Sequence, residues 1–215
     1  INHLKTLLDG CFLLGELSNR TSDAIMGFGE LLSSQIIAKA MEQKVPNSGY
    51  KDSREIIKTN NHFGKAVVNF ELSNQLIKDY FNSNAYRITI LPGFIASSTD
   101  GYSTTLGRGG SDYTAAILAG ALNAELLEIW TDVSGMFTAN PKIVKQAQPI
   151  ETISYQEAME LSHFGAKVLY PPTIQPILKL NIPIVIKNTF EPEAAGTYIS
   201  SERNENENPI KGISH

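Results

Sequence analysis

A glycine-rich segment at residues 104–113, TTLGRGGSDY, carries the side chains of this chain that are best suited to chemistry. Its glycines allow tight turns and a close approach of the backbone to a ligand, and the helix predicted behind them offers unpaired N–H groups to an anion. Arg108 adds a planar guanidinium that can bind a carboxylate or phosphate through two parallel hydrogen bonds. Asp112 would repel such an anion, which points to a magnesium phosphate or a cationic group nearby.

The same residues also suit an ordinary turn in which Ser111 or Asp112 caps a helix. Two better-known glycine motifs do not fit. A P-loop ends in Gly-Lys-Ser/Thr, and a dinucleotide fingerprint has Gly or Ala where Asp112 stands. The segment by itself therefore leaves the plain turn and the binding loop open.

The composition is that of one sizeable domain, or of one domain with an appendage, because 215 residues can bury a real core. A net charge of -4 without a lysine or arginine run argues against nucleic acid as a partner. Cys11 is the only cysteine, which excludes an internal disulfide framework and favours the cytoplasm. The apolar runs are too short for a membrane partner. The chain begins at Ile1 without a signal-like segment, and we expect a piece of something longer.

Helical and strand patterns alternate along the chain, which is typical of a layered α/β domain. The predicted helices cover residues 4–12, 21–43 (with a bend at 27–29), 74–81, 111–122, 154–164 and 173–180. The predicted strands cover residues 66–70, 87–91, 126–131 and 182–188, and residues 94–109 and 132–149 are expected to be loops. The polar residues 200–208 are typical of a linker, and residues 209–214 of the start of a new β-rich unit.

Functional residues in such folds gather at the carboxyl ends of the strands, where the loops face one crevice. The candidate positions there are residues 92–94, 104–112, 131–132 and 188–189. Taken singly, residues 131–132 suit an ordinary Asx turn, Lys142 an exposed lysine and Lys167 a lysine near a helix C-terminus. Their co-occurrence around one crevice is what favours a binding site.

Five segments together resemble the aspartokinases. They are residues 27–33 (GFGELLS), 106–113 (LGRGGSDY), 130–135 (WTDVSG), 154–161 (SYQEAMEL) and 164–169 (FGAKVL). The resemblance implies the amino acid kinase fold, a three-layer αβα sandwich with a central mostly parallel sheet, here truncated at the N-terminus. It also implies phosphorylation of the side-chain carboxylate of L-aspartate to 4-phospho-L-aspartate with ATP and Mg²⁺, on the route to lysine, threonine and methionine.

The resemblance assigns the amino acid site to one set of residues. Arg108 would bind a carboxylate of aspartate and Glu30 its α-ammonium, because a zwitterion needs both signs of charge. Asp112 would act with Arg108 in catalysis by organising the cationic groups around the transferred phosphoryl. The other implied substrate-binding residues are Phe94, Thr105, Gly109, Gly110 and Ser111.

A second set of residues is implied for ATP. It comprises Thr131, Asp132, Phe137, Lys142, Lys167 and Val168, and no side chain is assigned as a metal ligand. Thr131, Asp132 and Phe137 would hold the nucleoside, and the two lysines would meet the phosphates. Such a site fits phosphoryl transfer, which depends on positioning and charge neutralisation.

Three departures from the family pattern stand out, of which the first two concern the nucleotide side. The family usually has Tyr and Arg where this chain has Phe137 and Lys142, which removes a hydroxyl and replaces a planar fork by a point charge. Residues 170–172, Tyr-Pro-Pro, stand in place of His-Pro-Arg. The family's opening Lys-x-Gly-Gly-Thr-Ser loop has no counterpart after Ile1. We therefore expect ATP affinity to differ most, and the chain alone to be inactive.

The implied domain plan is a catalytic domain over residues 1–199, followed over residues 200–215 by a linker and the start of an ACT regulatory domain. A homo-oligomer would form through regulatory domains absent from this chain. Residues 12–15 and 154–169 resemble the homoserine-dehydrogenase fusions especially closely, and single-function enzymes stay open. The alternatives are another amino acid kinase, acting on glutamate, carbamate or a nucleotide, and a non-catalytic kinase-like regulatory module.

Overall fold

The computed structural model describes residues 1–141, 143–164, 169–202 and 212. They fall into two units, unit 1 (Ile1–Thr114) and unit 2 (Ala115–His215). No boundary is predicted at this point from the sequence, because helix α5 (Gly110–Leu122) runs across it. Three predicted ATP-binding residues lie outside the described residues, namely Lys142, Lys167 and Val168. Most of the predicted linker also lies outside them.

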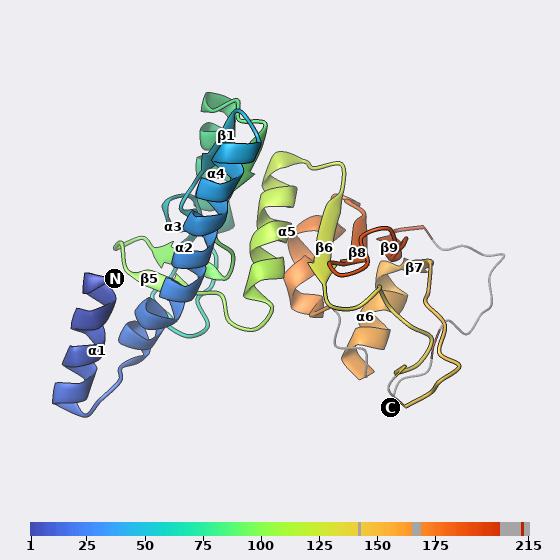
Figure 1. Ribbon diagram of the computed structural model, residues 1–215, viewed down its shortest axis with the longest axis horizontal. Helices are drawn as coiled ribbons and strands as arrows, with labels where there is room; N and C mark the ends of the chain where they lie inside the picture. The colour runs from blue at the N-terminus through green and yellow to red at the C-terminus, as the bar shows by residue number, and fades with distance from the viewer. Residues whose placement is uncertain (142, 165–168, 203–211, 213–215) are drawn as a thin grey trace. The chain divides into compact units, whose positions relative to one another are not determined.

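Unit 1 is built on the long helix α2 (Asn19–Lys44), against which α1 (Asn2–Leu14) packs (Figure 1). Ser18 caps α2 by accepting a hydrogen bond from the Thr21 N–H. The bend predicted at residues 27–29 is wrong, since α2 is one uninterrupted helix. Gly27 is instead buried, and a Cβ there would come within 3.3 Å of Ile95. The glycine therefore serves close packing and not a break in the helix.

Two small sheets complete unit 1. Strand β1 (Ser48–Tyr50) pairs in parallel with β3 (Ile88–Ile90). Strand β4 (Ile95–Ser98) lies between β2 (Lys58–Thr59), to which it is parallel, and β5 (Ser103–Thr105), to which it is antiparallel. Helices α3 (Ser53–Ile56) and α4 (Phe70–Ser83) connect these strands.

Two predictions fail in this region. Residues 66–70 are not a strand, because Val68 makes only a single bridge to Thr59, and Asn69 already caps α4 through the Leu72 N–H. Residues 94–109, predicted to be a loop, contain β4 and β5. Their serines and threonines suggest a loop, but in the folded chain Ser97, Ser98, Thr104 and Thr105 are buried. The Thr104 hydroxyl, for example, is hydrogen-bonded to the Thr59 hydroxyl over 2.8 Å.

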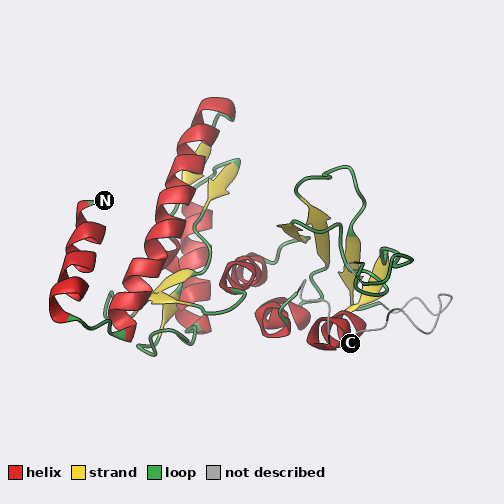
Figure 2. Ribbon diagram, turned by 60° about the horizontal axis from the view of Figure 1, so that its bottom comes forward, coloured by secondary structure: helices red, strands yellow, loops and turns green. Residues whose placement is uncertain are grey.

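Unit 2 has one four-stranded sheet in the order β6-β8-β9-β7. Strand β6 (Leu127–Thr131) is parallel to β8 (Ile184–Asn188), β8 is antiparallel to β9 (Thr197–Ser200), and β9 is parallel to β7 (Thr152–Ser154). The helices lie on one side of this sheet (Figure 2). They are the end of α5, α6 (Tyr155–Phe164), the 3₁₀ turn η1 (Pro171–Ile174) and α7 (Gln175–Leu178), so the helix predicted over 173–180 is split.

The expected α/β architecture is present, but its strands form three separate sheets in the described part of the chain. Parallel pairing predominates, as predicted, with antiparallel pairs only between β4 and β5 and between β8 and β9. None of the described helices combines the length and the apolar character that a bilayer crossing needs.

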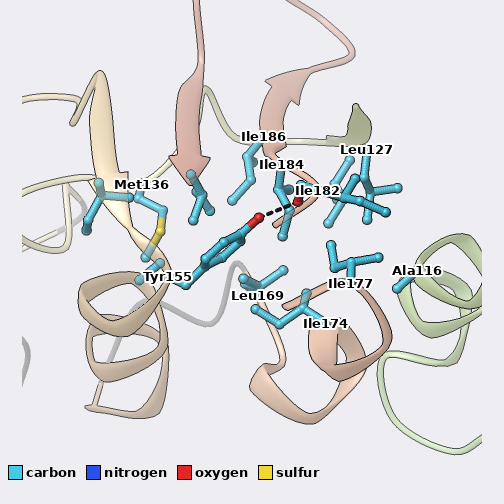
Figure 3. Close-up of a cluster of buried hydrophobic side chains, with 14 of the residues drawn as sticks. Ala116, Leu127, Met136, Tyr155, Leu169, Ile174, Ile177, Ile182, Ile184 and Ile186 are labelled. Atoms are coloured by element: carbon cyan, nitrogen blue, oxygen red, sulfur yellow. Dashed lines mark hydrogen bonds between the residues drawn. The ribbon is translucent and has the colours of Figure 1, made fainter. Parts of the chain in front are cut away.

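The core of unit 2 joins the inner face of the sheet to the helices (Figure 3). Ile184 and Ile186 of β8 are fully buried, while the alternate residue Lys187 points to the other face and lies 5.0 Å from the Trp130 ring. Tyr155 enters this core and its hydroxyl donates a hydrogen bond to the Ile182 carbonyl. Burial raises the pKa of Tyr155 to about 12, so the hydroxyl remains a donor at any physiological pH.

This hydrogen bond makes a testable contribution to stability. The Tyr155→Phe variant should lose about 1–3 kcal/mol of unfolding free energy, because the buried Ile182 carbonyl then loses its partner. Tyr198→Phe is the matched control, since the Tyr198 side chain is 42% exposed and water can replace any partner of its hydroxyl. Urea denaturation of both variants measures the difference, and equal stabilities would show that the Tyr155 hydroxyl contributes nothing.

Candidate active site

The glycine-rich segment forms a tight loop between β5 and α5. Gly107 and Gly109 have φ angles of 74° and 69°, in the left-handed region that favours glycine. The Gly110 N–H donates to the Gly107 carbonyl over 3.0 Å, and the Tyr113 N–H to the Gly109 carbonyl over 2.9 Å. Arg108 lies between the two glycines and is exposed. The loop therefore presents Arg108 to solvent immediately before the first turn of a helix.

A buried carboxylate on α2 holds the start of this loop. Asp23 is only 1% exposed and accepts three hydrogen bonds. Its Oδ2 accepts from the Thr105 N–H at 3.0 Å and from the Gly64 N–H at 2.9 Å, and its Oδ1 accepts from the Thr105 hydroxyl at 2.8 Å. The predicted substrate residue Thr105 is thus itself buried, 1% exposed, and turned toward Asp23.

Phe94 has an unusual backbone for a bulky residue, with a φ angle of 67°. Its N–H donates to the Thr114 hydroxyl over 3.0 Å, and its carbonyl accepts from the Leu106 N–H over 2.9 Å. These two bonds connect the turn after β3 to the glycine loop and to α5. Strained conformations of this kind persist where the surroundings fix them, and they cluster at functional sites.

The contact between this turn and the start of α5 leaves no room for side chains at two glycines. A Cβ at Gly110 would come within 2.8 Å of the Phe94 ring, and one at Gly93 within 3.0 Å of Ser111. Ser111 is exposed, and Asp112 is half-buried in the first turn of α5. Burial raises the pKa of the Asp112 carboxyl.

Glu30 belongs to the same unit and lies half-buried on α2. It comes one helical turn after Gly27, which packs on Ile95, the residue that follows Phe94. The helix also packs against β5, which leads into the Arg108 loop (Figure 1). All eight residues predicted for the amino acid site therefore belong to unit 1, and they come from α2, the turn before β4, strand β5, the loop that follows it and the first turn of α5.

The described nucleotide candidates lie at one edge of the sheet of unit 2. Thr131 ends β6 and is in register with Asn188, which ends the parallel strand β8. The Thr189 N–H donates to the Thr131 carbonyl over 2.8 Å, so the two strand ends lie together as predicted. The Thr131 hydroxyl donates to the exposed Asp132 over 3.2 Å.

The loop that follows is fixed to the sheet by side chains. Asn188 donates to the Ser134 hydroxyl over 2.8 Å, and Ser134 donates in turn to Glu191 over 2.8 Å. Further along, the Met136 N–H donates to the Thr197 hydroxyl over 2.7 Å. Phe137 follows directly, half-buried and bridged to Pro149. A segment predicted to be a plain loop is therefore held at several points close to Asp132 and Phe137.

Several of these supporting residues were not predicted from the sequence. Asp23 and Thr114 carry hydrogen bonds to the site, yet no short motif marks them. For Asp23 a weak signal exists, since it precedes Glu30 by seven residues and thus shares its face of a helix. Its partners Gly64 and Thr105 are 41 and 82 positions further along the chain, which no local pattern reveals.

Residues 6–188 match the model of the amino acid kinase family. The chain belongs to this family. It is 37% identical over 219 residues to bifunctional aspartokinase/homoserine dehydrogenase 1 of Arabidopsis thaliana, which covers 99% of this chain and 24% of that protein. It is 36% identical over 215 residues to lysine-sensitive aspartokinase 3 of Escherichia coli, which covers 96% of this chain and 46% of that protein.

Solved structures agree with these relatives. E. coli aspartokinase III in complex with aspartate and ADP superposes with a TM-score of 0.83 at 34% identity, over 95% of this chain and 47% of that one. The resemblance to aspartokinases and the amino acid kinase fold predicted from the motifs are thereby confirmed. The chain spans less than half the length of each of these relatives, and both fused and single-function enzymes are among them.

The close contact at Gly110 gives a stability test of the site's geometry. Gly110→Ala should lower the unfolding free energy by about 1–3 kcal/mol, because the new methyl group overlaps the Phe94 ring. Gly10→Ala, in α1 with open space around it, should instead raise stability by about 0.5–1 kcal/mol through helix propensity. Urea denaturation measures both, and a stabilising Gly110→Ala would contradict the packing described.

Proposed function

We propose that this chain carries the catalytic residues of an aspartate kinase, which transfers the γ-phosphoryl group of ATP to the side-chain carboxylate of L-aspartate. The observation that supports it most is the charged set around the glycine loop, with Arg108 and Glu30 on neighbouring elements of unit 1. The relatives add support, since they are aspartokinases and one was solved with aspartate and ADP.

The chemistry of aspartate explains this set of charges. Free aspartate has two carboxylates and one ammonium group, so a site for it needs donors and an acceptor close together. The guanidinium of Arg108 supplies two parallel N–H donors for a carboxylate, and the carboxylate of Glu30 accepts from the ammonium group. The exposed Ser111 hydroxyl and the backbone of Gly109 and Gly110 would complete the site beside Phe94.

ATP is the proposed phosphoryl donor, and Mg²⁺ its companion. Thr131, Asp132 and Phe137 would contact the nucleoside, while Lys142, Lys167 and Val168 are proposed from the resemblance. Among the residues that the structure describes, no group of three or more His, Cys, Asp or Glu side chains could hold a metal. Mg²⁺ is commonly held by nucleotide phosphates and one or two carboxylates, so it is proposed here to arrive with ATP.

Asp112 has a role in this proposal that follows from its environment. Its burial disfavours the ionised carboxylate, which a nearby cation would stabilise. A phosphoryl group in transfer is surrounded by such cations, and Asp112 would hold them in place while they neutralise its charge. We place the reaction in the cytoplasm, the compartment that the single cysteine favours.

The proposal is tested on the full-length protein by following ADP release with L-aspartate and Mg-ATP. L-Aspartate should be the substrate, and L-glutamate, carbamate and UMP should give little or no release. Arg108→Lys should weaken aspartate binding by about 1–3 kcal/mol, since a point charge cannot replace the planar fork. Arg87→Lys, an exposed arginine before β3, is the control. Faster release with one of the other acceptors, or none with any, would reject the assignment.

The proposed phosphate contact of Lys167 is tested separately. Lys167→Ala should weaken Mg-ATP binding about 10-fold to 100-fold, the range of a charge-assisted hydrogen bond, and should leave aspartate binding unchanged. Lys179→Ala, which removes an exposed lysine just after α7, controls for the loss of net charge. Calorimetric titration of the full-length variants with Mg-ATP gives the result. Equal affinities for the two variants would remove Lys167 from the phosphate site.

A further inference from the structure

One buried carboxylate of unit 1 has no part in the function described so far. Asp23 is 1% exposed, and no ion pair of Asp23 is found among the described residues. A buried charge without a cation is costly unless hydrogen bonds replace its hydration. Here three donors from two separate segments converge on it, at distances of 2.8 to 3.0 Å.

The donors show what Asp23 controls. Thr105 gives both of its hydrogens, from its N–H and its hydroxyl, to the two oxygens of this carboxylate. The hydroxyl proton therefore points at Asp23 and is not free to bind a carboxylate of the substrate. Since Thr105 is itself buried, its use lies in holding the chain that follows it. Arg108 comes only three residues later, in a loop whose other fixed points are Leu106 and Gly110.

Asp23 lies on the same helix as Glu30. The two residues are seven positions apart on the uninterrupted helix α2, which is about 10 Å along its axis and places them on the same face. A carboxylate that bonds the backbone before Arg108 thus belongs to the rigid element that carries Glu30. We propose that Asp23 is a positioning residue of the amino acid site, which fixes the Arg108 loop relative to α2 and so sets the affinity for the amino acid substrate.

This inference rests on the proposed function, and steady-state kinetics of the full-length enzyme test it. Asp23→Asn replaces one accepting oxygen by an amide that cannot accept, and should raise the KM for aspartate about 10-fold to 100-fold. The KM for Mg-ATP should change by no more than about twofold, because the loss concerns one substrate. Amide hydrogen exchange of residues 104–109 should become faster in the same variant.

The partner residue supplies a second variant in case Asp23→Asn does not fold. Thr105→Val removes the hydroxyl with little change in volume and should raise the aspartate KM in the same way, while Thr105→Ser keeps the hydroxyl and should restore it. The effect of the double variant on the aspartate KM should be smaller than the two single effects combined, since both variants remove or weaken the bond between the Thr105 hydroxyl and Asp23. Ser34→Ala is the control, because Ser34 is a buried residue of the same helix whose hydroxyl donates to the Leu31 carbonyl.

The possible outcomes separate the two claims. A wild-type enzyme without aspartate-dependent ADP release would reject the proposed function and this inference with it. An active wild type whose aspartate KM is unchanged in both Asp23→Asn and Thr105→Val would reject the inference alone. Equal losses in both substrates, or a lower unfolding free energy with normal KM values, would show a purely structural role and would also overturn it.

Discussion

The hydrogen bonds of one buried carboxylate determine how unit 1 is assembled around its glycine loop. Asp23 connects helix α2 to the end of β5 and to the turn at Gly64, which are 82 and 41 residues away along the chain. Because the charge is buried, the free energy of unfolding depends on all three donors being in place. Glu30 and Arg108, the two charged residues proposed for the amino acid site, follow Asp23 on α2 and Thr105 after β5 respectively.

A second constraint acts where the turn before β4 meets the start of α5. Phe94 keeps a left-handed backbone because hydrogen bonds to Thr114 and Leu106 hold both of its peptide groups. Its ring in turn requires a glycine at position 110. The glycines of this segment thus have two different functions, since Gly107 and Gly109 allow the chain to turn, whereas Gly110 allows two elements to touch. Together they define the path of the chain from β5 into the first turn of α5.

Unit 2 has an apolar core on one face of its sheet and hydrogen-bonded polar side chains at the ends of β6 and β8. The isoleucines of β8 and β9 and the ring of Tyr155 stabilise the sheet on its helix-covered face. At the ends of β6 and β8, hydrogen bonds among Asn188, Ser134 and Glu191 fix the loop that begins at Asp132. The family departure at Phe137 falls in this loop, and the backbone before it is held by the hydrogen bond from the Met136 N–H to the Thr197 hydroxyl.

The sequence by itself determined the long helices, the strands at 127–131 and 184–188 and the candidate residues of the site, because apolar periodicity and the Gly-Arg-Gly-Gly-Ser-Asp motif are local properties. It did not determine the short strands β4 and β5, whose serines and threonines are polar and become strand residues only once their hydroxyls are paired and buried. Nor did it show that Thr105 faces a carboxylate. Asp23, Gly64 and Thr105 are far apart in the chain, and only the tertiary structure decides which buried donors meet which acceptor, since most buried polar groups find a partner only in the folded state.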